Sequence, residues 1–505
     1  MATPVIVGTT FRGWYGVLGG LLAILLVVPI WAVEYPPLVD YPSHLARGYI
    51  LYHYDNVPSF AEHFEIDYLS APSLAMDLFM VGMQTVCDVR TAGKLFLTLT
   101  IWLWLGGWHL LGWAIHGRPT WLALGAALIA YHSMFFYGFT NFSFSLGVFL
   151  IAFAAWLHGR SHWAWPRHLL IAALALACFF SHMSAFIFLA GSVLAVTAWE
   201  WVKVRSVSRT AIIDVLPIFV PLGFLFRTRG GSGTAWDFPG KLAGALSLFR
   251  GYHRSVDIVF ILAVCLFIGL LFCWSRHTRA VGSILFAGVG CVLMFLIGPS
   301  TLFGGSPADA RFLPPAAALV FLSLELAFSR IKAIALLIIF LTLVGFRMAM
   351  IGAYWQAIDV DISAQVSLFA KLPLEAKLYP IVRIPDDAEE KKLALPTFHA
   401  ACYAVIERHA YVPTMLAVPG HMPLRYKKPP VTFHQDAASF AEVKRVDWEK
   451  VFVDYDYIWC CRAPRDYREF LAWDCTLIAE KGSGTLWRVD RMSKAALAAR
   501  QESLK

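Results

Sequence analysis

The chain has 505 residues, of which 58% are hydrophobic and 15% charged. A soluble domain of this length does not need so many apolar residues to fill its core, so the composition excludes a soluble globular protein and indicates a bilayer as the solvent. The net charge of +8 does not indicate nucleic-acid binding, because lysine and arginine stand in short clusters between apolar runs.

The first apolar run covers residues 14–33 and follows Arg12. A cleaved signal peptide is the alternative to a membrane span here, but no small-residue cleavage site precedes the Glu34-Tyr35-Pro36-Pro37 segment. We therefore expect a retained first helix.

Apolar runs long enough to cross a bilayer recur through residues 1–355, which we predict to be an all-α polytopic membrane domain with about eleven spans. Residues 71–87 are apolar but short, and we interpret them as a re-entrant or interfacial helix. The predicted spans are residues 14–33, 95–115, 120–137, 142–158, 169–181, 184–201, 210–226, 256–275, 281–298, 314–328 and 333–354.

The positions of lysine and arginine predict the orientation of these spans. Basic clusters at residues 160–167, 203–209, 276–279 and 330–332 mark cytoplasmic loops if the N-terminus is cytoplasmic. Two long outer loops, residues 34–70 and 227–255, then lie on the opposite side together with the segment around Asp309 and everything after residue 355.

Past residue 355 the apolar runs become short and β-like, which predicts a small soluble α/β domain over residues 356–490. Residues 491–505 form a polar tail. The strands are expected at 376–384, 455–461, 476–479 and 485–489, and helices near 397–409 and 465–472.

The nine cysteines contain no CxxC pair, so the sequence does not indicate a zinc or haem site. Four of them, Cys402, Cys460, Cys461 and Cys475, fall in the predicted outer domain. One or two disulfides and reduced, buried thiols are both compatible with that position.

The first candidate site follows the first span, in Val39-Asp40-Tyr41-Pro42-Ser43-His44-Leu45-Ala46-Arg47. Proline in the first turn predicts a helix start that brings Asp40, His44 and Arg47 together at the membrane surface. The alternative is that Asp40 only caps this helix while the basic residues meet lipid headgroups.

Two further candidates interrupt apolar runs. Asn141 stands in a predicted outward turn, where its amide could bind a sugar hydroxyl or simply shape the turn. His182 lies in Ser181-His182-Met183-Ser184 within a long apolar stretch. An ionisable residue at membrane depth suggests function, although a hydrogen-bonded histidine in a short turn is the alternative.

The fourth candidate is the Asp309-Ala310-Arg311 segment that leads into the tenth span. The arginine fork suits a phosphate, whereas an internal ion pair is the alternative. The second outer loop adds basic residues for the same anion, unless these anchor the loop at the interface. They are Lys241, Arg250, His253 and Arg254.

With an acid directly after the first span, two long outer loops and a C-terminal soluble domain, the sequence resembles the GT-C superfamily of polytopic glycosyltransferases. This superfamily includes protein O-mannosyltransferases and the aminoarabinose transferases of lipid A. The resemblance implies that Asp40 acts as catalytic acid/base with His44 beside it. The other candidates, Glu34 and Arg47 included, would bind a polyprenyl-phosphate sugar donor and an envelope acceptor.

The resemblance also implies a bacterial inner-membrane enzyme whose C-terminal domain is periplasmic. The sequence departs from the pattern because no Asp-x-Asp or Glu-Asp pair follows the first span, and Glu34 stands six residues before Asp40. A divalent cation stays open, but Asp40 and His44 are too few ligands to define a metal site.

Two other functions fit the same features. A transporter or flippase for a lipid-linked substrate would use the polar residues for binding alone, although no inverted repeat is evident. A non-catalytic protein of envelope-polysaccharide assembly would use the C-terminal domain as its interaction module.

Overall fold

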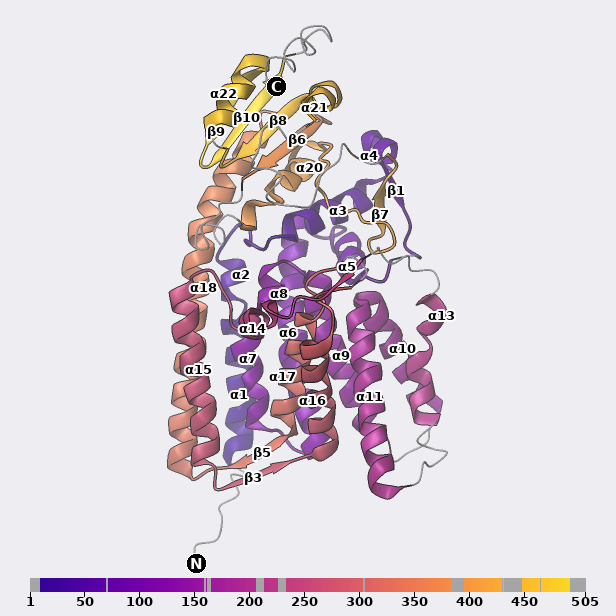
Figure 1. The fold of residues 1–505 in the computed structure, drawn as a ribbon, viewed down its shortest axis with the longest axis vertical. Helices are drawn as coiled ribbons and strands as arrows, with labels where there is room; N and C mark the ends of the chain where they lie inside the picture. Colours follow the sequence, from indigo (N-terminus) through magenta and orange to yellow (C-terminus); the bar gives the residue numbers. More distant parts are fainter. Residues whose placement is uncertain are drawn as a thin grey trace, which may run out of the picture.

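The computed structural model describes residues 10–69, 71–158, 160, 165–205, 213–225, 233–302, 305–383, 395–428, 430, 447–463 and 465–490. The predicted polar tail, 491–505, lies outside these residues. Long helices run side by side along the long axis of the molecule, and a β-sheet sits at one end of them (Figure 1).

Six helical segments among the described residues are long and apolar enough to cross a membrane, which agrees with a multi-pass protein. Four shorter apolar helices accompany them, at Trp165–Ser181 (α10), Ile213–Leu225 (whose last turn is α13), Gly282–Ile297 (α16) and Ala310–Ser323 (η4 and α17). The six are Trp14–Trp31 (α1 and α2), Val89–His116 (α6), Thr140–His158 (α9), Met183–Lys203 (α11), Arg254–Trp274 (α15) and Arg330–Phe369 (α18).

One predicted span, residues 120–137, does not form a continuous helix. It folds as η1 (Trp121–Gly125), α7 (Ala126–Ile129) and α8 (Ser133–Phe136), separated by a turn at Tyr131. Nearly all of this stretch is buried among other helices. Interrupted backbone is tolerated at membrane depth where protein surrounds it, and this explains why an apolar run need not be one span.

The last long helix, α18, extends well beyond the predicted end of its span at residue 354 and ends at Phe369. Its last turns pack against a four-stranded sheet with the order β6-β8-β10-β9. The strands lie close to the predicted positions, and β6 and β8 are parallel while the other pairs are antiparallel. They are β6 (Leu378–Val382), β8 (Tyr457–Cys461), β9 (Cys475–Lys481) and β10 (Gly484–Val489).

Helices α21 (Trp448–Asp454) and α22 (Arg465–Asp474) accompany this sheet, whereas the segment between β6 and α21 turns back to the membrane helices (Figure 1). In that segment η6 (Ala400–Cys402) and α20 (Tyr403–Arg408) pack on α3 (Tyr41–His53). This part of the C-terminal half therefore belongs to the same buried core as the first outer loop.

A second link joins the same two regions. Strand β7 (Leu424–Tyr426) pairs antiparallel with β1 (Phe64–Ile66) of the first outer loop. Backbone pairing fixes the register of the two segments, with Glu65 opposite Arg425 and an ion pair of 2.9 Å between their side chains.

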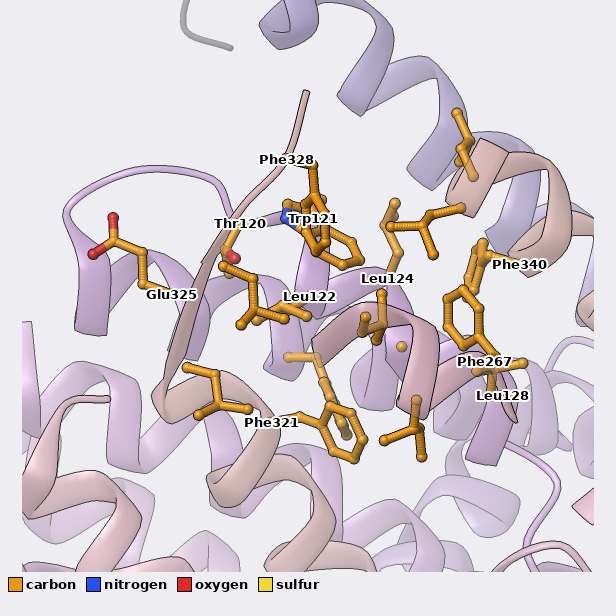
Figure 2. A pocket seen from close by; sticks show the side chains of 18 of the residues that line it. Thr120, Trp121, Leu122, Leu124, Leu128, Phe267, Phe321, Glu325, Phe328 and Phe340 are labelled. Carbon is orange, nitrogen blue, oxygen red and sulfur yellow. The ribbon is translucent and has the colours of Figure 1, made fainter. Parts of the chain in front are cut away.

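The opposite end of the bundle is closed by a short two-stranded sheet. Strand β3 (His277–Ala280) follows α15, and its partner β5 (Leu324–Ala327) precedes α18 (Figure 1). A cavity of about 1020 Å³ lies between this sheet and the neighbouring helices (Figure 2). The predicted basic loops at 276–279 and 330–332 thus lie at the same end.

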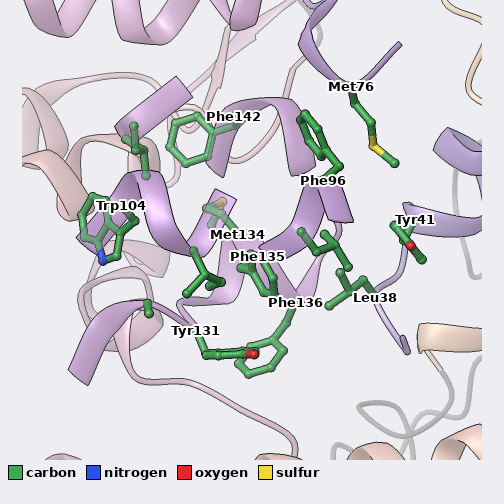
Figure 3. Packing of buried hydrophobic residues seen from close by; sticks show 14 of the residues in the cluster. Leu38, Tyr41, Met76, Phe96, Trp104, Tyr131, Met134, Phe135, Phe136 and Phe142 are labelled. Carbon is green, nitrogen blue, oxygen red and sulfur yellow. The ribbon is translucent and has the colours of Figure 1, made fainter. Parts of the chain in front are cut away.

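Aromatic residues from the interrupted segment pack with others from α6 and α9. Tyr131, Phe135, Phe136 and Phe142 gather with Trp104 in one buried cluster (Figure 3). The ring of Tyr131 meets those of Phe135 and Phe136 at centroid distances of 5.1 and 6.0 Å. This packing places the turn at Tyr137 and Gly138 next to Asp40, which precedes α3.

Candidate functional site

Asp40 directly precedes α3 and touches the turn that ends α8. Its backbone N–H donates to the Tyr137 carbonyl over 3.0 Å. Gly138 has φ +80°, and a Cβ there would lie 2.6 Å from the Asp40 nitrogen, so only glycine suits this approach. The Asp40 side chain makes no capping hydrogen bond to α3, which leaves its carboxylate available for other partners.

The carboxylate of Asp40 faces a histidine from the C-terminal half. Asp40 Oδ1 lies 3.5 Å from His399 Nε2, and the Asp40 side chain keeps 18% of its surface exposed. Burial raises the pKa of Asp40 to about 7, while the nearby charge of Arg47 acts in the opposite direction. Burial also lowers the pKa of His399 to about 4, so this imidazole is neutral at pH 7.

His44 has other partners than Asp40. Its Nδ1 lies 2.8 Å from Nη2 of Arg47 and accepts a hydrogen bond from that guanidinium, and the ring also bonds the backbone of Gly138. Burial, followed by the charge of Arg47, lowers the pKa of His44 well below its ordinary value. A neutral His44 therefore supports the turn beneath Asp40.

Arg47 is fully buried and bound to Asp77 of α5 (Ala75–Met83). Its Nε and Nη2 donate to the two carboxylate oxygens over 2.6 and 3.1 Å, and Nη1 donates to the Leu416 carbonyl over 3.2 Å. The guanidinium expected to meet a substrate is thus committed to an internal pair. It joins α3, α5 and the C-terminal segment.

Helix α5 has only nine residues, fewer than a helix needs to cross a bilayer, in keeping with an interfacial position for residues 71–87. Asn141 holds its start. The side-chain oxygen accepts from the Met76 N–H over 2.7 Å, and the amide nitrogen donates to the Ser73 carbonyl over 3.1 Å. The structure therefore places buried Asn141 in the first turn of α9, where its amide holds the start of α5 rather than shaping a turn of its own.

A second polar cluster surrounds Arg311. Its guanidinium lies 5.5 and 5.8 Å from the ring centres of Phe139 and Phe142. No acidic side chain pairs with it among the described residues, and its Nε is buried without a hydrogen-bond partner there. Burial lowers the pKa of His421, and the positive charge of Arg311 lowers it further. The same charge acts on His182.

His182 supports this cluster from the start of α11. Its Nδ1 accepts a hydrogen bond from the Ser184 N–H over 3.1 Å, and its ring meets Phe142 edge-on at 5.5 Å. Because Nδ1 acts as a cap, only Nε2 is left for other contacts. The cluster of Arg311, His182 and His421 thus presents a cation with no acid beside it in the described part of the chain.

Asp309 and Lys241 satisfy each other. Lys241 Nζ lies 2.6 Å from Asp309 Oδ2 and also donates to the carbonyls of Phe295 and Gly298 over 2.7 Å each. Asp309 Oδ1 accepts from the Ala310 N–H over 2.8 Å. This segment does contain an internal ion pair, as the alternative proposed, but Lys241 forms it with Asp309, and Arg311 takes no part in it.

The remaining predicted site residues have separate surroundings. Glu34 is exposed, pairs with Arg90 over 2.9 Å and donates its backbone N–H to Asp359 over 3.0 Å. The His253 ring stacks near Tyr354 at 6.3 Å. The side chains of Arg250 and Arg254 are exposed.

The described residues contain no group of three or more histidine, cysteine, aspartate or glutamate side chains arranged to hold a metal ion. All nine cysteines are free thiols, and Cys402, Cys460, Cys461 and Cys475 are buried. Of the two states considered for these four, the structure has the reduced one.

Comparison with solved structures places this geometry in a known fold. The chain is similar to ArnT from Cupriavidus metallidurans bound to undecaprenyl phosphate, with a TM-score of 0.53, 13% identity and coverage of 95% of this chain and 98% of ArnT. The chain has an ArnT-like fold. The apo form of ArnT gives a TM-score of 0.52 over the same coverage. The predicted resemblance to GT-C membrane proteins is therefore confirmed at the level of the fold.

The similarity to ArnT lies in the structure rather than in the sequence. No protein-family profile matches the chain, and no curated protein matches it. At 13% identity the ArnT-like fold assigns no function to any individual residue. The roles of Asp40 and Arg311 must therefore be inferred from the contacts that these two side chains make in this protein.

The buried pair of Arg47 and Asp77 yields a stability prediction. Replacing Arg47 with Met leaves a buried carboxylate uncompensated, and we expect it to lower the free energy of unfolding by ~3–5 kcal/mol. Reversible unfolding in mixed detergent micelles measures this change. In the double variant R47M/D77L, which restores neutrality with apolar groups, we expect partial recovery.

The exposed pair of Arg465 and Glu469 on α22, with an N–O distance of 2.8 Å, is the matched control. Arg465→Met should cost ~0–1 kcal/mol, as is usual for surface ion pairs. Equal losses for R47M and R465M would contradict a structural role for the buried pair.

Proposed function

We propose that this protein transfers a sugar from a polyprenyl-phosphate donor to a cell-envelope acceptor. The observation that carries this proposal is the pairing of two groups across one turn. Asp40, with a pKa of about 7, touches Gly138, and Arg311, which has no acidic partner among the described residues, lies over the ring of the adjacent Phe139. A proton acceptor and a cation are what a transfer from a phosphate leaving group requires.

Arg311 is the group that would hold the donor phosphate. Its planar fork can donate two parallel hydrogen bonds to phosphate oxygens, and the buried Nε has a donor to spare. The two phenyl rings beside it exclude water and strengthen the attraction. The ArnT structure bound to undecaprenyl phosphate supports a polyprenyl phosphate as the lipid partner.

Asp40 is the group that would accept the proton of the acceptor. The acceptor oxygen forms a bond to the anomeric carbon, and the bond from that carbon to the phosphate oxygen breaks. The acceptor proton passes to the Asp40 carboxylate, and the leaving group departs as polyprenyl phosphate. His399, 3.5 Å from the carboxylate, would position Asp40 for this step.

The arrangement of charges supports chemistry on the periplasmic side of a bacterial inner membrane. Helix α3, which Asp40 precedes, and the C-terminal sheet lie towards one end of the bundle, whereas β3, which contains Arg279, lies at the other (Figure 1). Helix α18, which follows β5 at that same end, begins with Arg330. Basic loops favour the cytoplasmic side. ATP and nucleotide sugars are absent from the opposite side, so a lipid-carried donor is a suitable supply.

Substitution of Asp40 tests its catalytic role. We expect Asp40→Asn to reduce glycosyl transfer at least ~100-fold, because general bases contribute factors of that order. Transfer is measured in membranes supplied with a polyprenyl-phosphate sugar, and monodisperse elution of the purified variant shows that it folds. Asp55→Asn, which changes an exposed acid in the same loop, should leave transfer unchanged.

Transfer that survives Asp40→Asn would remove Asp40 from the mechanism. A protein that moves a lipid-linked substrate across proteoliposomes with this substitution, and transfers no sugar, would instead be the transporter that the sequence also allows.

The raised pKa of Asp40 predicts the pH dependence of the rate. Below about pH 7 the carboxyl is mostly protonated and accepts no proton, so transfer should rise with pH and level off above pH 8. At pH 6 we expect the rate to be ~10-fold below this plateau. Rates at saturating donor from pH 5 to 9 measure the profile. A rate that falls from pH 6 to pH 8 would contradict Asp40 as base.

Arg311, a cation without an acidic partner in the described part of the chain, leads to a prediction about the affinity for the lipid phosphate. Arg311→Gln should weaken equilibrium binding of undecaprenyl phosphate ~10- to 100-fold, because it removes charge-assisted hydrogen bonds. Arg311→Lys, which keeps the charge but loses the fork, should fall between wild type and R311Q. If Arg250→Gln weakens binding while R311Q does not, the phosphate binds the second outer loop instead.

A further inference from the structure

The cavity at the end opposite Asp40 is not used by the proposed transfer reaction. It has a volume of about 1020 Å³ and lies between η1, α7, α15, α17 (Leu313–Ser323) and the first turns of α18. Small-molecule sites usually measure ~300–1,000 Å³, so this cavity has room for more than a side-chain packing defect.

The walls of the cavity are apolar and aromatic. Leu128, Phe267, Phe321 and Phe340 point into it from four different elements (Figure 2). A cavity with such walls stays dry or takes up hydrocarbon. A flexible alkyl chain from the surrounding bilayer is the hydrocarbon available to it.

Polar side chains of the lining gather on the β3–β5 sheet and the segment before η1. Arg279 of β3 lies directly opposite Glu325 of β5 in the antiparallel register, and Glu325 forms an ion pair with Arg118. All three line the cavity. Two arginines and one carboxylate lie at this edge, so it carries net positive charge and suits an anion at the end of the alkyl chain.

We propose that this cavity binds one acyl chain of an anionic glycerophospholipid, with the phosphate of that lipid at Arg279 and Arg118. Basic pockets between membrane helices are typical sites for anionic headgroups on the cytoplasmic side. Arg276 directly precedes β3, and Arg330 is the first residue of α18, so both add to the attraction for an anionic leaflet at this end.

The bound chain fills space that would otherwise separate α17 from the packed pair of α15 and α18. Because Arg279 and Glu325 belong to the sheet that ties α15 to α18, a headgroup there also stabilises this connection. The site is independent of the proposed donor site, since Arg311 and Asp40 do not line the cavity.

Filling the cavity tests the acyl-chain part of the proposal. The full chain is delipidated in detergent, mixed with dioleoyl-phosphatidylglycerol, and the retained lipid is counted by native mass spectrometry. Wild type should retain one phosphatidylglycerol, and Leu337→Trp, in the cavity wall on α18, should retain at least ~10-fold less. Leu341→Trp, one turn further and outside the cavity lining, should behave as wild type.

Reversing a charge tests the headgroup part. Arg279→Glu should weaken phosphatidylglycerol retention ~10-fold and leave the weaker retention of dioleoyl-phosphatidylcholine unchanged. Arg276→Glu, the same charge change three residues earlier and outside the lining, should have a smaller effect. Thermal unfolding of each variant without added lipid shows whether a loss reflects misfolding.

Three results would overturn the proposal. They are equal retention by L337W and wild type, equal retention of phosphatidylglycerol and phosphatidylcholine by wild type, and displacement of phosphatidylglycerol from wild type by equimolar undecaprenyl phosphate. The last would assign the cavity to the donor lipid. Because the readout is lipid retention, the experiment stands whether or not glycosyl transfer is found.

Discussion

Removal of water from the Asp40 carboxylate is the constraint on which the rest of the proposed site depends. An aspartate next to a long loop would ordinarily be ionised and well hydrated, with a pKa near ~4. Here the turn at Gly138 lies against its backbone, and His399 returns from the C-terminal half to cover it, so the pKa rises to about 7. The membrane helices hold these distant segments in place.

The buried ion pair of Arg47 and Asp77 explains how the C-terminal segment is held over Asp40. Arg47 Nη1 donates to Leu416 while Nε and Nη2 hold Asp77, so one side chain fixes α3, α5 and the C-terminal segment together. The strand pair β1–β7 adds backbone hydrogen bonds to the same connection. The Asp40 carboxylate stays poorly hydrated only if the C-terminal segment is fixed in place. If that segment moved away, water would reach the carboxylate and its pKa would return to the ordinary value.

Features set by neighbouring residues can be predicted from the sequence, and features set by distant ones cannot. The apolar runs predict the long helices, and the four C-terminal strands lie near the predicted positions, because periodicity is local. Asp77 and His399 escape prediction as partners, since nothing near them in sequence indicates Arg47 or Asp40. Residues 120–137, predicted as one apolar helix, fold as three short helices instead, because an apolar run does not show that protein, rather than lipid, surrounds it.

The contrast between Arg47 and Arg311 shows why a charged residue in an apolar context cannot be assigned from its position alone. Both arginines follow an aspartate in a segment at a helix start, and the sequence suggests a substrate contact for both. Arg47 finds Asp77 on another helix and is fully paired. The acid nearest Arg311 in sequence, Asp309, is taken by Lys241, which leaves Arg311 over two phenyl rings without an acid among the described residues. Lys241 therefore contributes to the proposed phosphate site indirectly, by occupying the carboxylate that would otherwise neutralise Arg311.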